Sequence, residues 1–356
     1  MRNTTRCFGF YFTVIFFGLF SHLLTPGHAL SQSPFYQGKT ISMIFASDAG
    51  GTADMRVKAF VAVFRKHIPG NPTVVIEYMP GGGGRKAANH VFRSARPDGL
   101  IIGAMLGGLV SSAVLGETGV LYDLDKFIYL GSPDSAAQYV FFTRKDAGFS
   151  NVEKLRSALG VRVGAQNVGS WSYTLGRAFA YLVGMREPKF VTGYSGPELD
   201  LALARGEVDS RANTADTVVR RNHEWIEKGF VNFHAILEIP RGNKHPRFAG
   251  VPELESFAKA GKDQRLLAML SRFRETGLPY VLPPGTPRDR VQILQEATRK
   301  TFEDPEFYKE YQKLAGEDPT PLTAEGLEKA IKTLPREPDT IDLFKQLSGT
   351  AALPAR

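Results

Sequence analysis

The sequence has 356 residues, with 44 Lys and Arg against 36 Asp and Glu, a formal net charge of +8 and a single cysteine. Residues of opposite charge are interspersed and no basic block is interleaved with aromatic residues, which argues against a nucleic-acid partner. The length exceeds what one hydrophobic core usually holds, so two domains are expected.

The N-terminal segment has the layout of a secretory signal peptide. Two arginines precede an apolar run over residues 8–24, and Gly27-His28-Ala29 offers small residues to a signal peptidase. We therefore expect residues 1–29 to be cleaved and the mature chain to be periplasmic. The alternative is an uncleaved anchor, because a run of this length just suffices to span a bilayer.

The only cysteine, Cys7, lies in this segment. A mature chain without it has no thiol for a disulfide, a thiolate metal site or a cysteine nucleophile. The basic excess that remains after cleavage is small, and it predicts a mildly positive field that attracts small anions.

Strand-type runs alternate with helix-type runs along the mature chain. Strands are predicted at residues 40–46, 73–78, 100–105, 161–165 and 190–192, and helices at 53–67, 86–94, 170–183 and 197–205. This alternation predicts doubly wound, largely parallel sheets, and its repetition predicts two similar α/β lobes. Three further helices are expected to start at Thr286-Pro287, Asp304-Pro305 and Thr323, from their capping residues.

Four loops place glycine between a strand and a helix start: Ala49–Thr52, Gly81–Gly84, Gly169–Ser170 and Ser195–Gly196. The first amides of a helix have no intrahelical partner, glycine lets a ligand approach them, and the helix dipole favours negative charge. In a doubly wound sheet such loops lie at the carboxyl ends of the strands and line one crevice. The pattern therefore predicts a site for a small anion.

The ligand-binding residues predicted for this crevice are Ala49, Gly50, Gly51, Thr52, Asp54, Gly81, Gly82, Gly83, Gly84, Asn167, Ser170, Trp171, Tyr194 and Asn213. The glycine loops would offer backbone amides, and the second lobe would offer polar side chains. Asp54 is expected to accept hydrogen bonds from loop amides, or to orient a water or an ammonium group of the ligand. Trp171 and Tyr194 adjoin loop glycines, so each either packs in the core or covers the ligand.

Other chemistries fit the sequence less well. The loop at Gly81–Gly84 lacks the Gly-Lys-Ser/Thr of a phosphate loop and the third glycine of a dinucleotide site. Pro197 stands where a nucleophile elbow needs glycine, so Ser195 is interpreted as a helix N-cap, although a triad with His223 or His234 stays open. The histidines do not cluster at metal-binding spacing. We predict no catalytic residue, metal or cofactor.

The motifs of this sequence, and their order along the chain, resemble those of the periplasmic receptors of tripartite tricarboxylate transporters, the Bug (TctC) family. The resemblance rests on Asp48–Asp54, Tyr78–Gly84, Pro97–Gly99, Gly169–Ser170, Tyr194–Leu199 and Pro283–Pro287. Three features depart from the family: Ser195 replaces a lysine, Trp171 is bulkier than usual, and the stretch 243–277 is long and charged.

The resemblance implies a type II periplasmic-binding-protein fold, the Venus flytrap, with two doubly wound lobes. Residues 36–132 and 265–356 would form lobe one, and 133–264 lobe two. Two loops of lobe one would hold a carboxylate through amides and bound water, and lobe two would close over it. The implied function is a monomeric receptor that delivers a small carboxylate to membrane transporter subunits. A sensor for a membrane signalling partner and, further off, a serine hydrolase are the alternatives.

Overall fold

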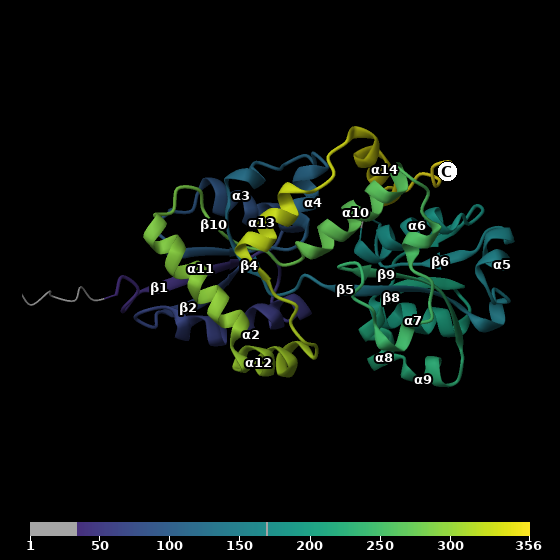
Figure 1. Cartoon of the computed structure of the whole chain (residues 1–356), viewed down its shortest axis with the longest axis horizontal. Coiled ribbons are helices and arrows are strands. Elements are labelled where there is room, and N and C mark those ends of the chain that lie inside the picture. The colour runs from purple at the N-terminus through teal and green to yellow at the C-terminus, as the bar shows by residue number, and fades with distance from the viewer. Residues whose placement is uncertain (1–33, 169) are drawn as a thin grey trace, which may run out of the picture. The chain divides into compact units, whose positions relative to one another are not determined.

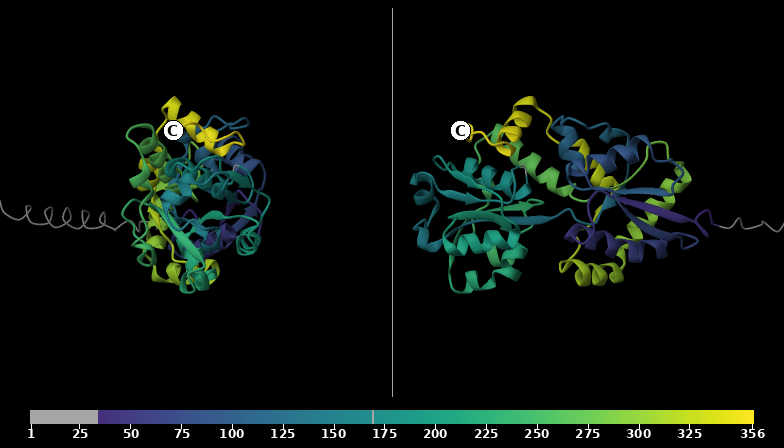
Figure 2. Two further views of the ribbon diagram at one scale, coloured as in Figure 1. Left: turned by 90° about the vertical axis from the view of Figure 1, so that its right-hand side faces the viewer. Right: turned by 180° about the vertical axis from the view of Figure 1, so that it is seen from behind.

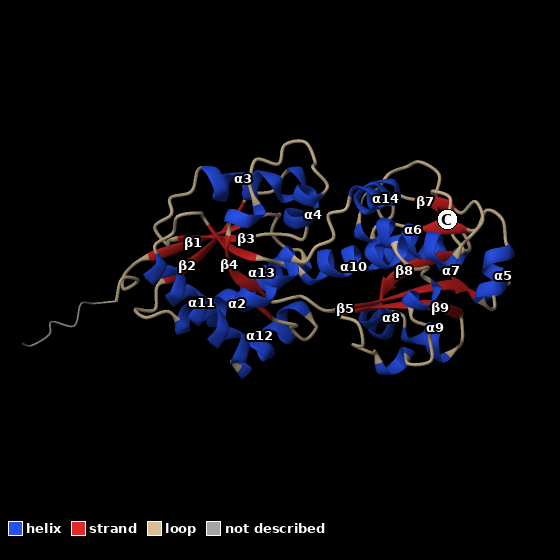
Figure 3. Cartoon of the chain, turned by 45° about the horizontal axis from the view of Figure 1, so that its top comes forward, coloured by secondary structure: helices blue, strands red, loops and turns tan. Residues whose placement is uncertain are grey.

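The computed structural model describes residues 34–168 and 170–356. The predicted signal peptide and Gly169 lie outside these residues. Contacts group Tyr36–Arg356 into one unit, which contains two β-sheets flanked by helices (Figures 1 and 3). Within the described residues, no helix is both long and apolar enough to cross a bilayer.

The first sheet has the strand order β11-β4-β10-β3-β1-β2. Its strands are β11 (Leu322–Thr323), β4 (Ile128–Ser132), β10 (Tyr280–Leu282), β3 (Ile101–Ala104), β1 (Thr40–Phe45) and β2 (Thr73–Tyr78). β1 pairs in parallel with β2 and β3, whereas β10 runs antiparallel to β3 and β4. The sheet is therefore mixed: β1, β2, β3 and β4 run in one direction as expected, and β10 and β11 run in the other.

The second sheet has the order β7-β6-β8-β5-β9. Its strands are β7 (Lys189–Val191), β6 (Arg162–Gly164), β8 (Ser210–Thr214), β5 (Ala137–Arg144) and β9 (Val231–Ile239). β6 is parallel to β7 and β8, and β5 is antiparallel to β8 and β9. This sheet is also mixed, because its first strand, β5, runs opposite to the others.

Helices lie on both faces of each sheet. Those near the first sheet are α2 (Thr52–His67), α3 (Arg85–Arg93), α4 (Gly108–Val114), α11 (Arg288–Glu303), α12 (Pro305–Ala315) and α13 (Ala324–Lys332). Those near the second are α5 (Val152–Ser157), α6 (Trp171–Val183), α7 (Gly196–Arg205), α8 (Ala215–Arg221) and α9 (His223–Glu227). Along β5, Phe141 stacks on Phe179 of α6, while Val140 and Phe142 join the cluster of α7 and α8, as the alternation of a strand requires.

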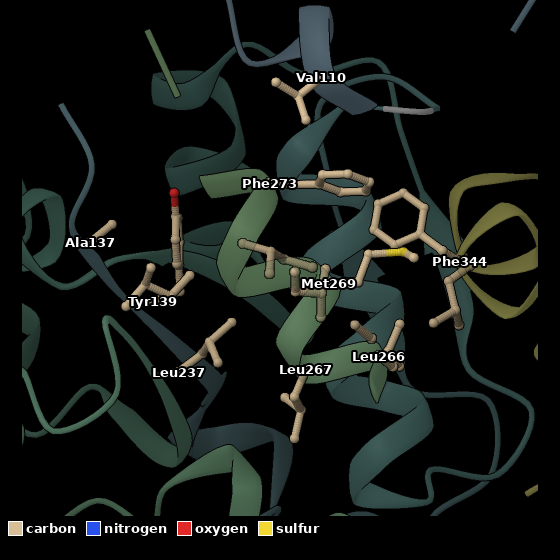
Figure 4. Close-up of a cluster of buried hydrophobic side chains, with 14 of the residues drawn as sticks. Val110, Ala137, Tyr139, Leu237, Leu266, Leu267, Met269, Phe273 and Phe344 are labelled. Carbon is tan, nitrogen blue, oxygen red and sulfur yellow. The ribbon is translucent and has the colours of Figure 1, made fainter. Parts of the chain in front are cut away.

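The helix α10 (Lys262–Glu275) joins the cores of the two sheets. Its buried residues Leu266, Met269 and Phe273 belong to one buried cluster with Tyr139 and Leu237 of the second sheet (Figure 4). The same cluster contains residues of α4 and of α14 (Pro338–Ser348). Because α14 packs on α6, the end of the chain lies beside α6, on the side of the second sheet (Figures 1 and 2).

The contacts made near the C-terminus affect where the boundary between the two proposed lobes is drawn. The division into 36–132 with 265–356, and 133–264, stays a prediction. Tyr173 of α6 donates a hydrogen bond to the Gly349 carbonyl at 2.8 Å. A boundary that follows such contacts would place the last residues with the second sheet.

Two of the three predicted helix starts near the C-terminus are confirmed. Asp304 caps α12 and Thr323 caps α13, each by accepting a backbone N–H. The start at Thr286-Pro287 needs a correction. Pro287 is the N-cap of α11, and the Thr286 hydroxyl donates to the Pro283 carbonyl, so it does not cap the helix.

Candidate ligand-binding site

Three strand-end loops meet at one edge of the first sheet. The strands β1, β2 and β3 are parallel, so their carboxyl ends share that edge. A methyl group built on Gly108, at the start of α4, would lie only 2.8 Å from the Gly83 carbonyl oxygen. One on Gly84 would lie 3.5 Å from the Ala46 side chain. The sequence therefore brings the β1, β2 and β3 loops into contact through glycine.

The β1–α2 loop holds the first four predicted residues. Ala49, Gly50, Gly51 and Thr52 are exposed. Gly50 has a φ of 92°, the left-handed region that favours glycine, and Gly51 is the N-cap of the sixteen-residue helix α2. No side chain caps this helix end. The first amides of α2 are thus left for water or for a ligand.

Asp54 is buried beneath this loop. It accepts hydrogen bonds from the Gly50 N–H at 2.7 Å, from the Lys58 ammonium at 2.7 Å and from the Tyr78 hydroxyl at 2.9 Å. Burial acts to raise the pKa of Asp54, but these hydrogen bonds outweigh it and lower the pKa. The prediction that Asp54 binds loop amides is confirmed. One consequence is that the Gly50 amide is occupied by the protein itself.

The second glycine loop has an irregular backbone. Gly81, Gly82, Gly83 and Gly84 all have positive φ angles, from 59° to 129°, and the first three are exposed. Gly84 is the N-cap of α3 in the left-handed region, and no side chain caps this helix either. Four consecutive residues in this region need glycine because a Cβ would strain the backbone. The loop exposes main chain at the same sheet edge as the α2 N-terminus.

The predicted residues of the second sheet follow its strands. Asn167 is exposed, and Ser170 caps α6 by accepting the Tyr173 N–H at 3.3 Å. Trp171 packs edge-to-face on Tyr139 at 6.2 Å between ring centres, and Tyr194 is half-buried against the α7 and α8 cluster.

Asn213 lies in β8, near its carboxyl end. Its side-chain oxygen accepts the Thr214 N–H at 2.9 Å. Within the described residues, the Asn213 Nδ2 and the Trp171 Nε1 are buried without a hydrogen-bond partner. The parallel strands β6, β7 and β8 bring these residues to one edge of the second sheet, and no direct contact joins them to the glycine loops.

A polar cavity of about 390 Å³ is lined by residues of α2, α10 and α12 and by residues of β5, β8 and α8. The motifs of the sequence did not predict it. Asp134, which follows β4, contacts both Arg56 of α2 and Arg274 of α10, the latter at 2.5 Å. Arg56 also pairs with Glu317, and Arg220 of α8 lies 4.0 Å from Glu317. These residues are spread over the whole chain, so no spacing rule could have found them.

Ser195 acts as the structure-forming residue that the sequence predicts. Its hydroxyl accepts the Glu198 N–H, and the Glu198 carboxylate accepts the Ser195 N–H at 2.7 Å, which completes a capping box at α7. His234, a possible triad partner, bonds instead to Thr143 at 2.8 Å. In the described residues, no group of three His, Cys, Asp or Glu side chains could hold a metal ion.

Two mixed α/β sheets, each with helix N-termini at its strand-end loops, define the type II periplasmic-binding-protein fold. Solved structures agree. The periplasmic binding protein BugD is 21% identical with a TM-score of 0.58, and the match covers 88% of this chain and 98% of BugD. A TctC solute-binding protein from Polaromonas is 19% identical with a TM-score of 0.63, over 88% of this chain and 98% of its own.

A third structure carries a ligand. MatC from Rhodopseudomonas palustris, solved with bound malate, is 19% identical with a TM-score of 0.55, over 87% of this chain and 99% of MatC. No protein-family model matches the sequence, and no curated protein matches it either. The chain therefore has the fold of the Bug and TctC periplasmic binding proteins, and the predicted resemblance is confirmed at the level of the fold.

Proposed function

We propose that this chain is a periplasmic solute-binding receptor that captures a small carboxylate for a tripartite tricarboxylate-type transporter. The observation that carries the proposal is the uncapped N-terminus of α2 beside the glycine loop 81–84. Both present main-chain N–H groups, and the α2 dipole favours a negative charge there. MatC, which shares the fold, was solved with malate, a carboxylate.

The charge of Asp54 is compatible with an anion in this loop. Asp54 is fully buried and forms an ion pair with Lys58, whose side chain is 40% exposed. The ammonium group offsets the carboxylate charge, so an incoming anion meets the helix dipole and the amides rather than a bare negative charge. Asp54 would therefore support the loop without touching the ligand.

The second sheet would complete the site. Asn167, Ser170 and Asn213 lie at the carboxyl ends of strands or at a helix start. In the proposed mechanism, they bind the rest of the ligand when the lobes close, and the ligand shifts the population toward the closed state. The closed state would present a surface to the membrane transporter. Export by the segment 1–29 would place the receptor in the periplasm.

The test is a thermal-shift and calorimetric screen of the exported protein against mono-, di- and tricarboxylates and their neutral amides. Ligand at 100 times its Kd should add about 2.7 kcal/mol to the free energy of unfolding. Binding of carboxylates but not of the matching amides is the expected result. If amides bind as well as acids, the carboxylate proposal is wrong, and if neither binds, the receptor proposal itself loses its support.

A further inference from the structure

Arg177 of α6 is a buried cation without a buried anion. The residue is only 1% exposed, and within the described residues it has no acidic partner. Two other largely buried arginines, Arg211 and Arg274, each contact an aspartate. A buried charge normally needs an ionic or fully hydrogen-bonded environment. Arg177 therefore stands out from the chain's other buried arginines.

The hydrogen bonds of Arg177 go to neutral groups and do not use all its donors. Its Nη2 donates to the Ala351 and Gln346 carbonyls at 2.6 and 3.2 Å, and its Nη1 to the Tyr173 hydroxyl at 3.5 Å. The Nε is buried and has no partner in the part of the chain that the structure describes. Burial lowers the pKa of Arg177, with Tyr173 opposing the shift. The Nε–H and part of the Nη1 group remain for an anion.

Arg177 lines a cavity of about 760 Å³ between α6 and the C-terminal residues 350–356. The walls are both apolar and polar, and the guanidinium lies 4.7 Å from the ring centre of Phe190. Glu187 is at the exposed rim and forms no ion pair with Arg177, and Arg356 pairs with Asp263 at 3.1 Å. The cavity thus combines an aromatic and aliphatic wall, which includes Phe190 and Leu353, with the incompletely paired cation of Arg177.

We propose that this cavity is a second ligand site, distinct from the glycine loops of the first sheet, for an organic anion with an apolar body and one carboxylate head. The carboxylate would accept hydrogen bonds from the Arg177 Nε–H and Nη1–H, and the body would lie against Phe190 and the tail. Because the tail covers Arg177, residues 350–356 shift outward when the ligand enters. The cavity shares no lining residue with the proposed receptor site, and the proposal does not depend on that site.

The test uses hexanoate as the probe and hexanamide as its neutral counterpart. In the exported protein, hexanoate is expected to shift the NMR signal of the Arg177 Nε–H, which is assigned by its loss in R177Q. Hexanamide should bind at least about tenfold more weakly, because the ion pair between the guanidinium and the carboxylate is replaced by a hydrogen bond to a neutral carbonyl. Equal binding of acid and amide, or an unmoved Arg177 signal at saturating hexanoate, overturns the proposal.

Variants supply an independent arm of the test. R177Q should weaken hexanoate binding about tenfold or more, whereas R186Q, which removes the same charge from an exposed residue nearby, should not. G51V, in the strand-end loop, should leave the response of the Arg177 signal intact. Loss of that response in G51V would mean that hexanoate acts through the receptor site, and the second site would be wrong. If R177Q does not fold, the comparison of acid and amide on the G51V protein decides, because the proposed receptor site is disabled in that variant.

Discussion

Asp54 shapes the β1–α2 loop, because its carboxylate holds Gly50, Lys58 and Tyr78 at once. D54A leaves the Gly50 N–H and the Tyr78 hydroxyl without their acceptor. Water reaches part of both groups, so we expect a loss of about 1–3 kcal/mol in the free energy of unfolding. Urea denaturation measures it. D48N, which removes an exposed charge from the same loop, should change stability by less than about 0.5 kcal/mol.

The pKa of Asp54 also predicts a pH dependence. Its folded-state pKa lies below the ordinary value of 3.8, so the unfolded chain binds this proton more readily than the folded one. The stabilisation is present above pH 3.8 and is lost as the pH falls through the folded-state pKa. The difference in unfolding free energy between wild type and D54N should therefore narrow in acid. A difference that stays constant from pH 7 to pH 3 would contradict this assignment.

Gly51 allows a clean test of the proposed ligand site. Its φ of −81° suits any residue, and a Cβ built there meets nothing within 4 Å. G51V should therefore fold normally, yet its side chain would cover the amides at the start of α2. We expect carboxylate affinity to fall by at least about tenfold, as measured by calorimetry. Because valine is a poorer N-cap than glycine, a loss of up to about 1 kcal/mol in the free energy of unfolding is expected as well. G250V, at another open glycine, is the control, and unchanged affinity in G51V would remove this loop from the site.

At the level of elements, Ser195 is the N-cap of α7, as its position before Pro197 predicts. Its capping box with Glu198 predicts that S195A costs about 1 kcal/mol of stability, while S195N keeps the cap. Denaturation measures both variants. Ligand affinity should be unchanged in S195N. An ester-hydrolysis activity that disappears in S195A would instead support the hydrolase alternative.

Elements with local signals were predictable, and those with distant partners were not. The strand β2 occupies residues 73–78 as predicted, and α6 and α7 end at Gly184 and Gly206, glycines in the left-handed region. The strand β10 has three residues and pairs with strands more than a hundred residues earlier. No periodicity in so short a run indicates its direction, so the mixed character of the sheets escaped prediction.

In the candidate site, too, contacts between residues close in sequence were predictable and contacts between distant elements were not. The glycine loops and the bond from Gly50 to Asp54 follow from residues four positions apart, because a strand, a glycine turn and a helix leave few alternatives. The bond from Tyr78 to Asp54 depends on the parallel pairing of β1 with β2. The packing of Trp171 on Tyr139 depends on a strand that the sequence did not indicate. Side-chain contacts between elements required the three-dimensional arrangement.

At the scale of the whole molecule, Asp134 joins elements from distant parts of the chain. It follows β4, contacts Arg56 of α2 and Arg274 of α10, and is 7% exposed. Burial opposes the charged form of Arg274, but Tyr139 and Asp134 outweigh it and raise its pKa. Removal of Asp134 would leave two arginines at the cavity without this carboxylate.

We expect D134A to lower the free energy of unfolding by about 3–5 kcal/mol, since a buried charge that loses its partner is strongly destabilising. R56M should lower the free energy of unfolding by less than D134A does. Asp134 still forms its ion pair with Arg274 in this variant, and the Arg56 side chain is 20% exposed. In D134A/R274M the loss should be smaller than in D134A alone, because the second change removes the unpaired buried cation. Urea denaturation of the three variants gives the order. R274M completes the double-mutant cycle. If D134A/R274M is as unstable as the sum of D134A and R274M, the Asp134–Arg274 pair does not couple the strand β4 to α10 energetically.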